Sequence, residues 1–282
     1  MKALKLTSVA FALASLSLVA SCADEEESII IAGAPMWDQT CGVTVPASDY
    51  LQGGRLDVRF ETEYRVPLEI QNQLQAQSAQ ESNSGTDTSE LQIVGVDVRI
   101  SSPHNPDLIE ELREEDPALV DFTPSIPTNS LGGGDTLGMS VTGIPGSTAS
   151  RLAAERVERA LAAGDEAVAA LGGGATELEI AQARAAAENG VLNSTETYDV
   201  HISLRARRTG NNVGGVGEIE AREFKFPVEV CYGCLLSCVG CQEASQCPAS
   251  TTGRLFKNDF VGLNFECGTA QDDTLIPVAC EM

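Results

Sequence analysis

The strongest constraint on this fold is an alternation of apolar and charged residues with a period of two. Between residues 56 and 70, even positions are mostly apolar, and most odd positions are charged. This period is typical of a strand with one face buried and the other in water. Pro67 interrupts the run, and because proline cannot donate to a strand ladder, it predicts an edge or a break between two strands.

The same alternation returns at 91–100 and 198–206, and again from 219 to 230. In the last stretch the apolar phase changes at Arg222 and Glu223, which is the signature of a β-bulge. Residues 71–90 are rich in Gln, Ser and Gly and predict a mobile loop. Residues 101–147 predict turns with one strand near 137–141, and residues 255–265 predict a last hairpin.

One segment, about 148–190, has helical rather than strand character. A first helix is expected from about residue 151 to 163, capped by Ser147, Thr148 or Ser150 and extending to about 171. Three glycines then break it. Thr176 with Glu179 resembles a capping box for a second helix that ends near Gly190. Large apolar residues are few, which favours a helical hairpin packed on a sheet at one side only. An arm that binds a partner is the alternative.

The first 22 residues resemble a bacterial lipoprotein signal. Lys2 and Lys5 precede an apolar run that is too short to span a bilayer. The run ends in Val19, Ala20, Ser21 and Cys22, which resembles a lipobox. The resemblance implies cleavage after residue 21 and lipidation of Cys22. Ala23 follows in place of the Asp that favours inner-membrane retention, so the resemblance implies anchoring in the outer membrane, facing the periplasm or the surface.

The chain carries a net charge of −23, and loss of the signal lysines makes it more negative. Such a field repels phosphate backbones, so nucleic acid is not expected as a partner. The expected partners are the membrane, through the lipid, and an envelope protein or polymer of unknown identity.

Eight cysteines remain once Cys22 carries the lipid. They are Cys41, Cys231, Cys234, Cys238, Cys241, Cys247, Cys267 and Cys280. In an exported chain an even set of this size predicts four disulfides, of unassigned connectivity. The alternative is a zinc or iron–sulfur site at Cys231, Cys234, Cys238 and Cys241, where two CxxC pairs lie three residues apart.

These features predict a mainly β chain. After the signal at 1–21, an acidic, flexible tether should cover 22–40. A sandwich-like antiparallel domain with the helical insertion should cover 41–230, and a disulfide-rich segment packed on the sheet should cover 231–282.

No catalytic motif accompanies this fold. His104 lies in a Pro/Asn loop and His201 on the polar face of a strand, and neither adjoins a nucleophile motif in sequence. The acidic run from Asp107 to Asp116, expected on a short helix, lacks the pattern of a calcium loop and is interpreted as a solvated face. We therefore expect a non-catalytic binding or structural module of the envelope, without cofactor or catalytic residues. The alternative is an anchored enzyme or metal-handling protein that uses the cysteine cluster.

Overall fold

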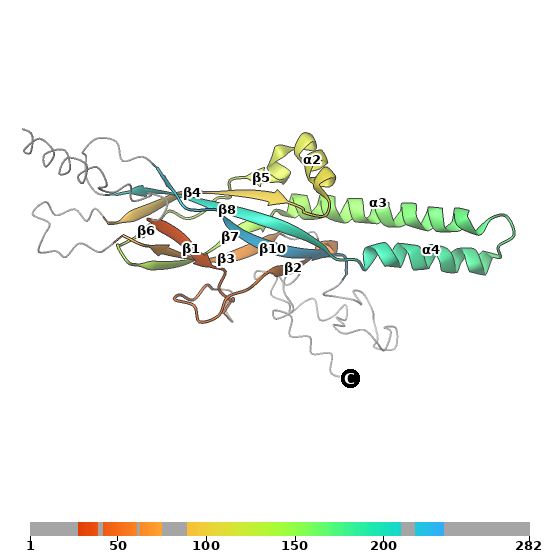
Figure 1. The fold of residues 1–282 in the computed structure, drawn as a ribbon, viewed down its shortest axis with the longest axis horizontal. Coiled ribbons are helices and arrows are strands. Elements are labelled where there is room, and N and C mark those ends of the chain that lie inside the picture. The colour runs from red at the N-terminus through yellow and green to blue at the C-terminus, as the bar shows by residue number, and fades with distance from the viewer. Residues whose placement is uncertain (1–27, 39–41, 61–62, 75–88, 210–217, 234–282) are drawn as a thin grey trace, which may run out of the picture.

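The computed structural model describes residues 28–38, 42–60, 63–74, 89–209 and 218–233. In these residues strand exceeds helix, so the expectation of a mainly β chain is confirmed. Two sheets enclose the core, and a pair of long helices extends beyond the ends of the strands (Figure 1).

The smaller sheet is antiparallel, with strand order β1-β3-β7. Its strands are β1 (Ile29–Gly33), β3 (Tyr64–Asn72) and β7 (Thr136–Ile144). Pro67 lies inside β3 opposite Ser140, so it does not break the strand. The ladder between β1 and β3 covers only residues 69–72 of β3. Pro67 therefore lies where the described ladder has one neighbouring strand, which is where a missing N–H is tolerated.

The larger sheet has seven strands, in the order β2-β10-β8-β4-β5, with β6 also on β4 and β9 on β8. They are β2 (Gly54–Asp57), β4 (Leu91–Ser101), β5 (Asp121–Phe122), β6 (Asn129–Leu131), β8 (Glu196–Arg208), β9 (Ile219–Glu220) and β10 (Phe224–Cys231). The β2–β10 pair is parallel, whereas the other pairs are antiparallel. The sheet is therefore mixed, and the expectation of a purely antiparallel domain is wrong at this edge.

The alternating run at 56–70 is divided between the two sheets. A short 3-10 helix, η2 (Val58–Phe60), follows β2, and β3 then enters the other sheet. Leu56 and Val58 are buried before the change of sheet, and Tyr64, Val66, Leu68 and Ile70 are buried after it. The apolar residues of the two parts therefore keep one alternation although they belong to different sheets. The close approach of Tyr64 explains Gly54, because a Cβ there would overlap the Tyr64 hydroxyl.

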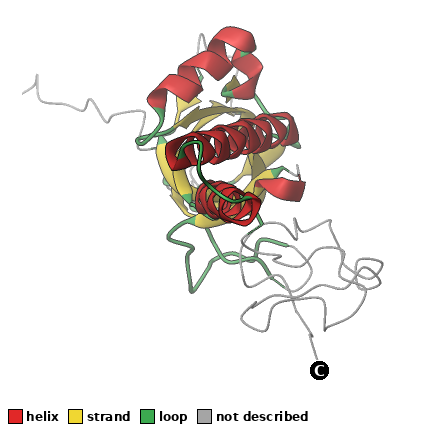
Figure 2. Cartoon of the chain, turned by 90° about the vertical axis from the view of Figure 1, so that its right-hand side faces the viewer, coloured by secondary structure: helices red, strands yellow, loops and turns green. Residues whose placement is uncertain are grey.

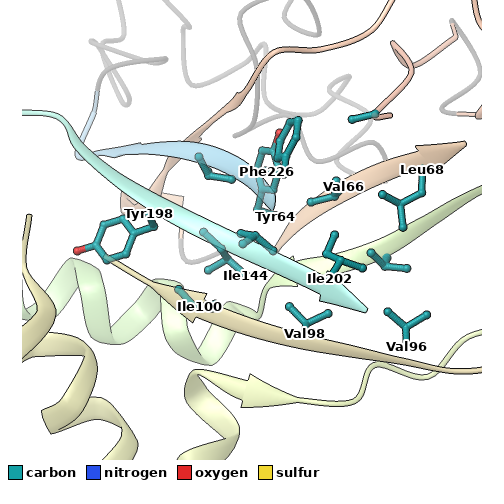
Figure 3. Close-up of a cluster of buried hydrophobic side chains, with 14 of the residues drawn as sticks. Tyr64, Val66, Leu68, Val96, Val98, Ile100, Ile144, Tyr198, Ile202 and Phe226 are labelled. Atoms are coloured by element: carbon teal, nitrogen blue, oxygen red, sulfur yellow. The ribbon is translucent and has the colours of Figure 1, made fainter. Parts of the chain in front are cut away.

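Side chains from both sheets meet in one hydrophobic core (Figure 3). Tyr64 of β3 stacks on Phe226 of β10 with ring centroids 6.3 Å apart. Val98 of β4 and Ile202 of β8 contribute from the neighbouring strands of the larger sheet. The period-two pattern thus identified most of the buried face of each strand. Val94, expected on the buried face with Val96, Val98 and Ile100, is instead exposed, because the register of β4 against β8 shifts between Ile93 and Gly95.

Residues 101–147 contain more regular structure than their turn-rich sequence predicted. Helix α2 (Pro106–Glu115) begins at Asn105, whose side chain accepts a hydrogen bond from the backbone of Leu108, with proline in the first turn. A 3-10 turn, η3 (Pro117–Leu119), then leads into β5, β6 and β7. The short helix expected for the acidic run at 107–116 is thus present, and its buried face consists of Leu108, Ile109 and Leu112 at helical spacing.

The helical hairpin is confirmed as α3 (Gly146–Leu171) and α4 (Glu177–Leu192). The capping box of Thr176 and Glu179 is present. The expected cap of α3 is wrong: α3 begins after Pro145, and the Thr148 hydroxyl instead donates to the Leu119 carbonyl, 2.5 Å away. Gly190 does not end α4, which continues to Leu192, because Gly190 does not adopt the left-handed backbone of a helix-ending glycine.

The domain begins earlier than predicted. Strand β1 lies within the expected tether at 22–40, and Ile29 is fully buried, because β1 pairs with β3. The signal at 1–21, Cys22, Cys41, most of the loop at 71–90, the hairpin at 255–265 and the cysteine-rich segment from residue 234 onward lie outside the described residues.

Candidate functional site

The larger sheet presents a polar face on the side away from the core. Alternation along β4 and β8 places Asp97, Arg99 and Ser101 beside His201 and Arg205 there. Register pairs Arg99 with His201, and Ser101 lies one diagonal step away. Apart from Ser101, these residues are polar members of the alternating runs. The alternation predicted only that their side chains face solvent.

Ion pairs connect these side chains across strands. Arg205 Nε lies 2.8 Å from the Asp97 carboxylate, which also accepts a 2.7 Å hydrogen bond from the Thr123 hydroxyl. Lys225 of β10 pairs with Asp199 of β8 at 2.7 Å. Because most of these groups are partly exposed, each pair contributes little to stability.

His201 makes the most specific arrangement on this face. Its Nδ1 lies 2.8 Å from Glu223 Oε1, and its Nε2 lies 2.9 Å from Ser101 Oγ. Glu223 Oε2 accepts a second hydrogen bond, of 2.9 Å, from Arg99. The His201 side chain is only 14% exposed, so its ring is held in place. This cluster could not be predicted from local patterns, because Ser101 and His201 are a hundred residues apart.

Charge on Glu223 determines which way these hydrogen bonds run. The hydrogen bond from His201, together with the charge of Arg99, lowers the pKa of Glu223. An ionised carboxylate only accepts, so Nδ1 of a neutral His201 must carry the proton. Nε2 is then the acceptor, and Ser101 donates its hydroxyl proton to it.

A cavity of about 380 Å³ opens beside this cluster. His201, Glu223 and Arg99 line it, together with Asp97, Val98, Asp121, Phe122, Thr123 and Ser203. Its volume is at the lower end of the range for small-molecule sites.

The helical hairpin forms the second region of interest, and its base is fixed by a buried arginine. Arg156 of α3 is 2% exposed. Its guanidinium donates to the carbonyls of Ser194 (2.5 Å) and Val230 (3.3 Å) and lies 3.6 Å from Glu196. Arg159, one turn later, contacts Glu196 at 2.7 Å. The base of α3 is thus attached to the start of β8 and to the end of β10.

This environment shifts the ionisation of Glu196, Tyr198 and Glu155. Burial raises the pKa of Glu196, but the hydrogen bond and charge of Arg159, with the charge of Arg156, outweigh it and leave the pKa below its usual value. Burial and the neighbouring Glu196 carboxylate raise the pKa of Tyr198, whose hydroxyl donates to Glu196 at 3.0 Å. Burial raises the pKa of Glu155.

Beyond this base the hairpin leaves the core. No residue of α4 is buried, and Leu161, Leu171 and Leu178 are 55%, 42% and 66% exposed. The outer part, here called the distal arm, comprises residues 161–192. Its helices touch closely at Gly164, where a Cβ would crowd Glu188 and Arg184. In the end-on view, α3 and α4 lie across the end of the strands (Figure 2).

Of the eight cysteines predicted to form disulfides, the structure describes one, Cys231. Cys231 is 1% exposed at the end of β10, and the other cysteines lie outside the described residues. In the described part, no group of three or more His, Cys, Asp or Glu is arranged to hold a metal. His104 is exposed, and the acidic residues of α2 face solvent, as expected, with Glu110 and Glu115 paired to Arg113 and Arg151.

The comparisons add no relative from which a function could be transferred. No known family matches this sequence, and no curated protein matches it significantly.

Proposed function

We propose that this chain is a lipid-anchored protein of the cell envelope that binds an envelope protein or polymer through its distal arm. The lipobox-like signal that ends at Cys22 supports the anchor, and the helical hairpin that extends from the domain supports the binding role. We further propose that the two sheets form a sandwich-like unit and that the eight remaining cysteines form four disulfides. None of the helices in the described part of the chain has the length and apolarity that a bilayer crossing requires.

The observation that carries the proposal is that none of the sixteen residues of α4 is buried, and that ten of them are exposed. Helices in globular domains are stabilised mainly by burying an apolar face, and α4 buries none in the core. The domain would keep its core without the distal arm, so the arm's length is not explained by folding. Exposed leucines on a rigid helical surface are typical of a contact surface.

The charge of the distal arm restricts the partner. Residues 161–192 carry five acidic side chains and one basic side chain, Arg184. Arg184 is already paired with Asp165 at 2.7 Å. The complementary surface is therefore basic with an apolar centre, and nucleic acid is disfavoured.

Site-specific photo-crosslinking in cells tests this role. A photoreactive amino acid at Leu161 or Leu178 should give a discrete crosslinked product, whereas the same residue at Val94, exposed on β4, should not. Equal products at all three positions, or none, would reject the arm as the contact. Replacing residues 164–190 with a short Gly/Ser linker should abolish the product but leave the thermal unfolding of the domain unchanged.

The anchor has its own test. Cys22→Ser should abolish incorporation of radiolabelled palmitate and release the protein from the membrane fraction. Retained label in this variant would place the lipid elsewhere and remove the lipobox interpretation.

A further inference from the structure

The side chains of Ser101, His201 and Glu223 are arranged differently from an ordinary surface ion-pair network. A hydroxyl, an imidazole and a carboxylate form one line of hydrogen bonds, 2.9 Å and 2.8 Å long. Each residue comes from a different segment: the end of β4, the middle of β8 and the residue before β10. In this order the imidazole can take the hydroxyl proton while the carboxylate orients it and stabilises its charge.

The surroundings suit such a proton transfer. Glu223 is fixed by Arg99 at 2.9 Å, so its carboxylate is oriented before any substrate arrives. His201 is largely shielded and faces Arg99 and Ser101 from β4 and Glu223 and Lys225 from the β10 segment. Lys225 pairs with the Asp199 carboxylate at 2.7 Å, which offsets its charge. The neutral, Nδ1-protonated ring is therefore the form that accepts the serine proton.

We propose that Ser101, His201 and Glu223 form a hydrolytic centre for small carboxylic esters. Ser101 Oγ attacks the ester carbonyl carbon as its proton passes to His201 Nε2. The ester C–O bond then breaks, and His201 returns the proton to the departing alcohol. Water, deprotonated by the same nitrogen, cleaves the acyl-serine to give the acid and free Ser101. No redox partner or metal enters this sequence.

The adjoining cavity restricts the substrate. Ser101 is not among its lining residues but is hydrogen-bonded to His201, which is, so an ester attacked by Ser101 would extend into the cavity from beside His201. About 380 Å³ accommodates a small ester but not a long acyl chain. Asp97, Asp121 and Glu223 line it, which disfavours anionic substrates. Arg99 is the permanently charged cation among its lining residues, and in this proposal its guanidinium supplies the hydrogen-bond donors for the developing oxyanion.

The test uses the purified full-length mature chain, a fluorophosphonate probe and p-nitrophenyl acetate. The probe should label Ser101, identified by peptide mapping of the wild-type chain, so that this readout needs no variant. Ester hydrolysis by Ser101→Ala should fall to the buffer rate. Ser130→Ala, at an exposed serine of β6, is the matched control and should keep wild-type activity.

His201→Asn should lower kcat by about 10²–10⁴-fold. Glu223 acts through His201 as a positioning residue. Glu223→Gln should lower kcat with little change in KM, and Glu223→Asp should recover part of the loss, which a merely structural role would not produce. If the probe labels Ser101 no faster than Ser130, or if Ser101→Ala hydrolyses the ester like wild type, the centre is only a hydrogen-bonded part of the sheet face. Either result leaves the arm-binding proposal unaffected.

Discussion

The two parts of the helical hairpin have similar alanine-rich sequences and opposite environments. In the base, from Gly146 to Ala160, Leu152 and Arg156 are 3% and 2% exposed. In the distal arm, Leu161 is 55% exposed and α4 buries nothing. A 26-residue helix is about 39 Å long, and the sheets cover only its beginning (Figure 1). The difference teaches that position relative to the sheet edge, rather than composition, divides α3 into a structural part and a free part.

The largest expected effect is at Arg156. Arg156→Ala leaves the carbonyls of Ser194 and Val230 and the Glu196 carboxylate without this donor. Breaking a buried charged network costs about 3–5 kcal/mol. Urea denaturation should show that loss, whereas Arg184→Ala, which breaks an exposed pair in the distal arm, should cost under about 1 kcal/mol. Similar losses for both variants would contradict the division of the hairpin.

Two leucines nine positions apart on α3 give a matched comparison without charge. Leu152→Ala should lower the free energy of unfolding by about 2–5 kcal/mol, because it leaves a cavity in the core. Leu161→Ala should change it by less than about 0.5 kcal/mol. A large effect of Leu161→Ala would show that the distal arm is packed in solution.

Acid should weaken the base of the hairpin. The pKa of Glu196 is lower in the folded state than in the unfolded chain, so its contribution is present above the unfolded pKa and is lost as pH falls through the folded one. The free energy of unfolding should therefore decrease between about pH 5 and pH 3. Glu196→Gln should be less stable at pH 7 and should show a shallower decrease. Burial raises the pKa of neighbouring Glu155, which acts in the opposite direction, so the wild-type and variant curves must be compared. Parallel curves would mean that Glu196 does not carry this dependence.

The smallest global effect is expected at the cap of α4. Thr176→Ala removes the hydroxyl that accepts from the backbone of Glu179, which costs a helix about 1 kcal/mol. Amide exchange in α4 should accelerate roughly fivefold, while the global free energy of unfolding stays within about 0.5 kcal/mol of wild type. A matching global loss would mean that α4 unfolds together with the sheets.

Local pattern was enough for the secondary structure wherever one period dominated. The strands at 91–101 and 196–208 followed from alternation, and the hairpin followed from helical spacing, three glycines and the capping box of Thr176. The prediction failed where periods were short or mixed. The short strands β5 and β6 lay in a stretch predicted as turns, and β1 lay within the expected tether.

The candidate sites were less predictable than the strands that carry them. Alternation placed His201 on an outward face, whereas Ser101 fell among the turns predicted after residue 100. The pattern gave no information about which strand lies beside which. The pairing of β4 with β8 and of β8 with β10 brings Ser101, His201 and Glu223 together from positions up to 122 residues apart. Strand register depends on long-range packing of the opposite faces, so no local signal encodes this cluster.

By itself, the sequence determined most of the apolar residues that are buried along each strand, where the helical hairpin lies and that its outer helix has few large apolar groups. These properties follow from neighbouring residues, because burial of alternate side chains depends only on the period. The tertiary structure decided how one alternating run divides between two sheets, where α3 leaves the core, and which polar side chains meet on the outer face. Those outcomes depend on strand order, which is selected by the whole core at once.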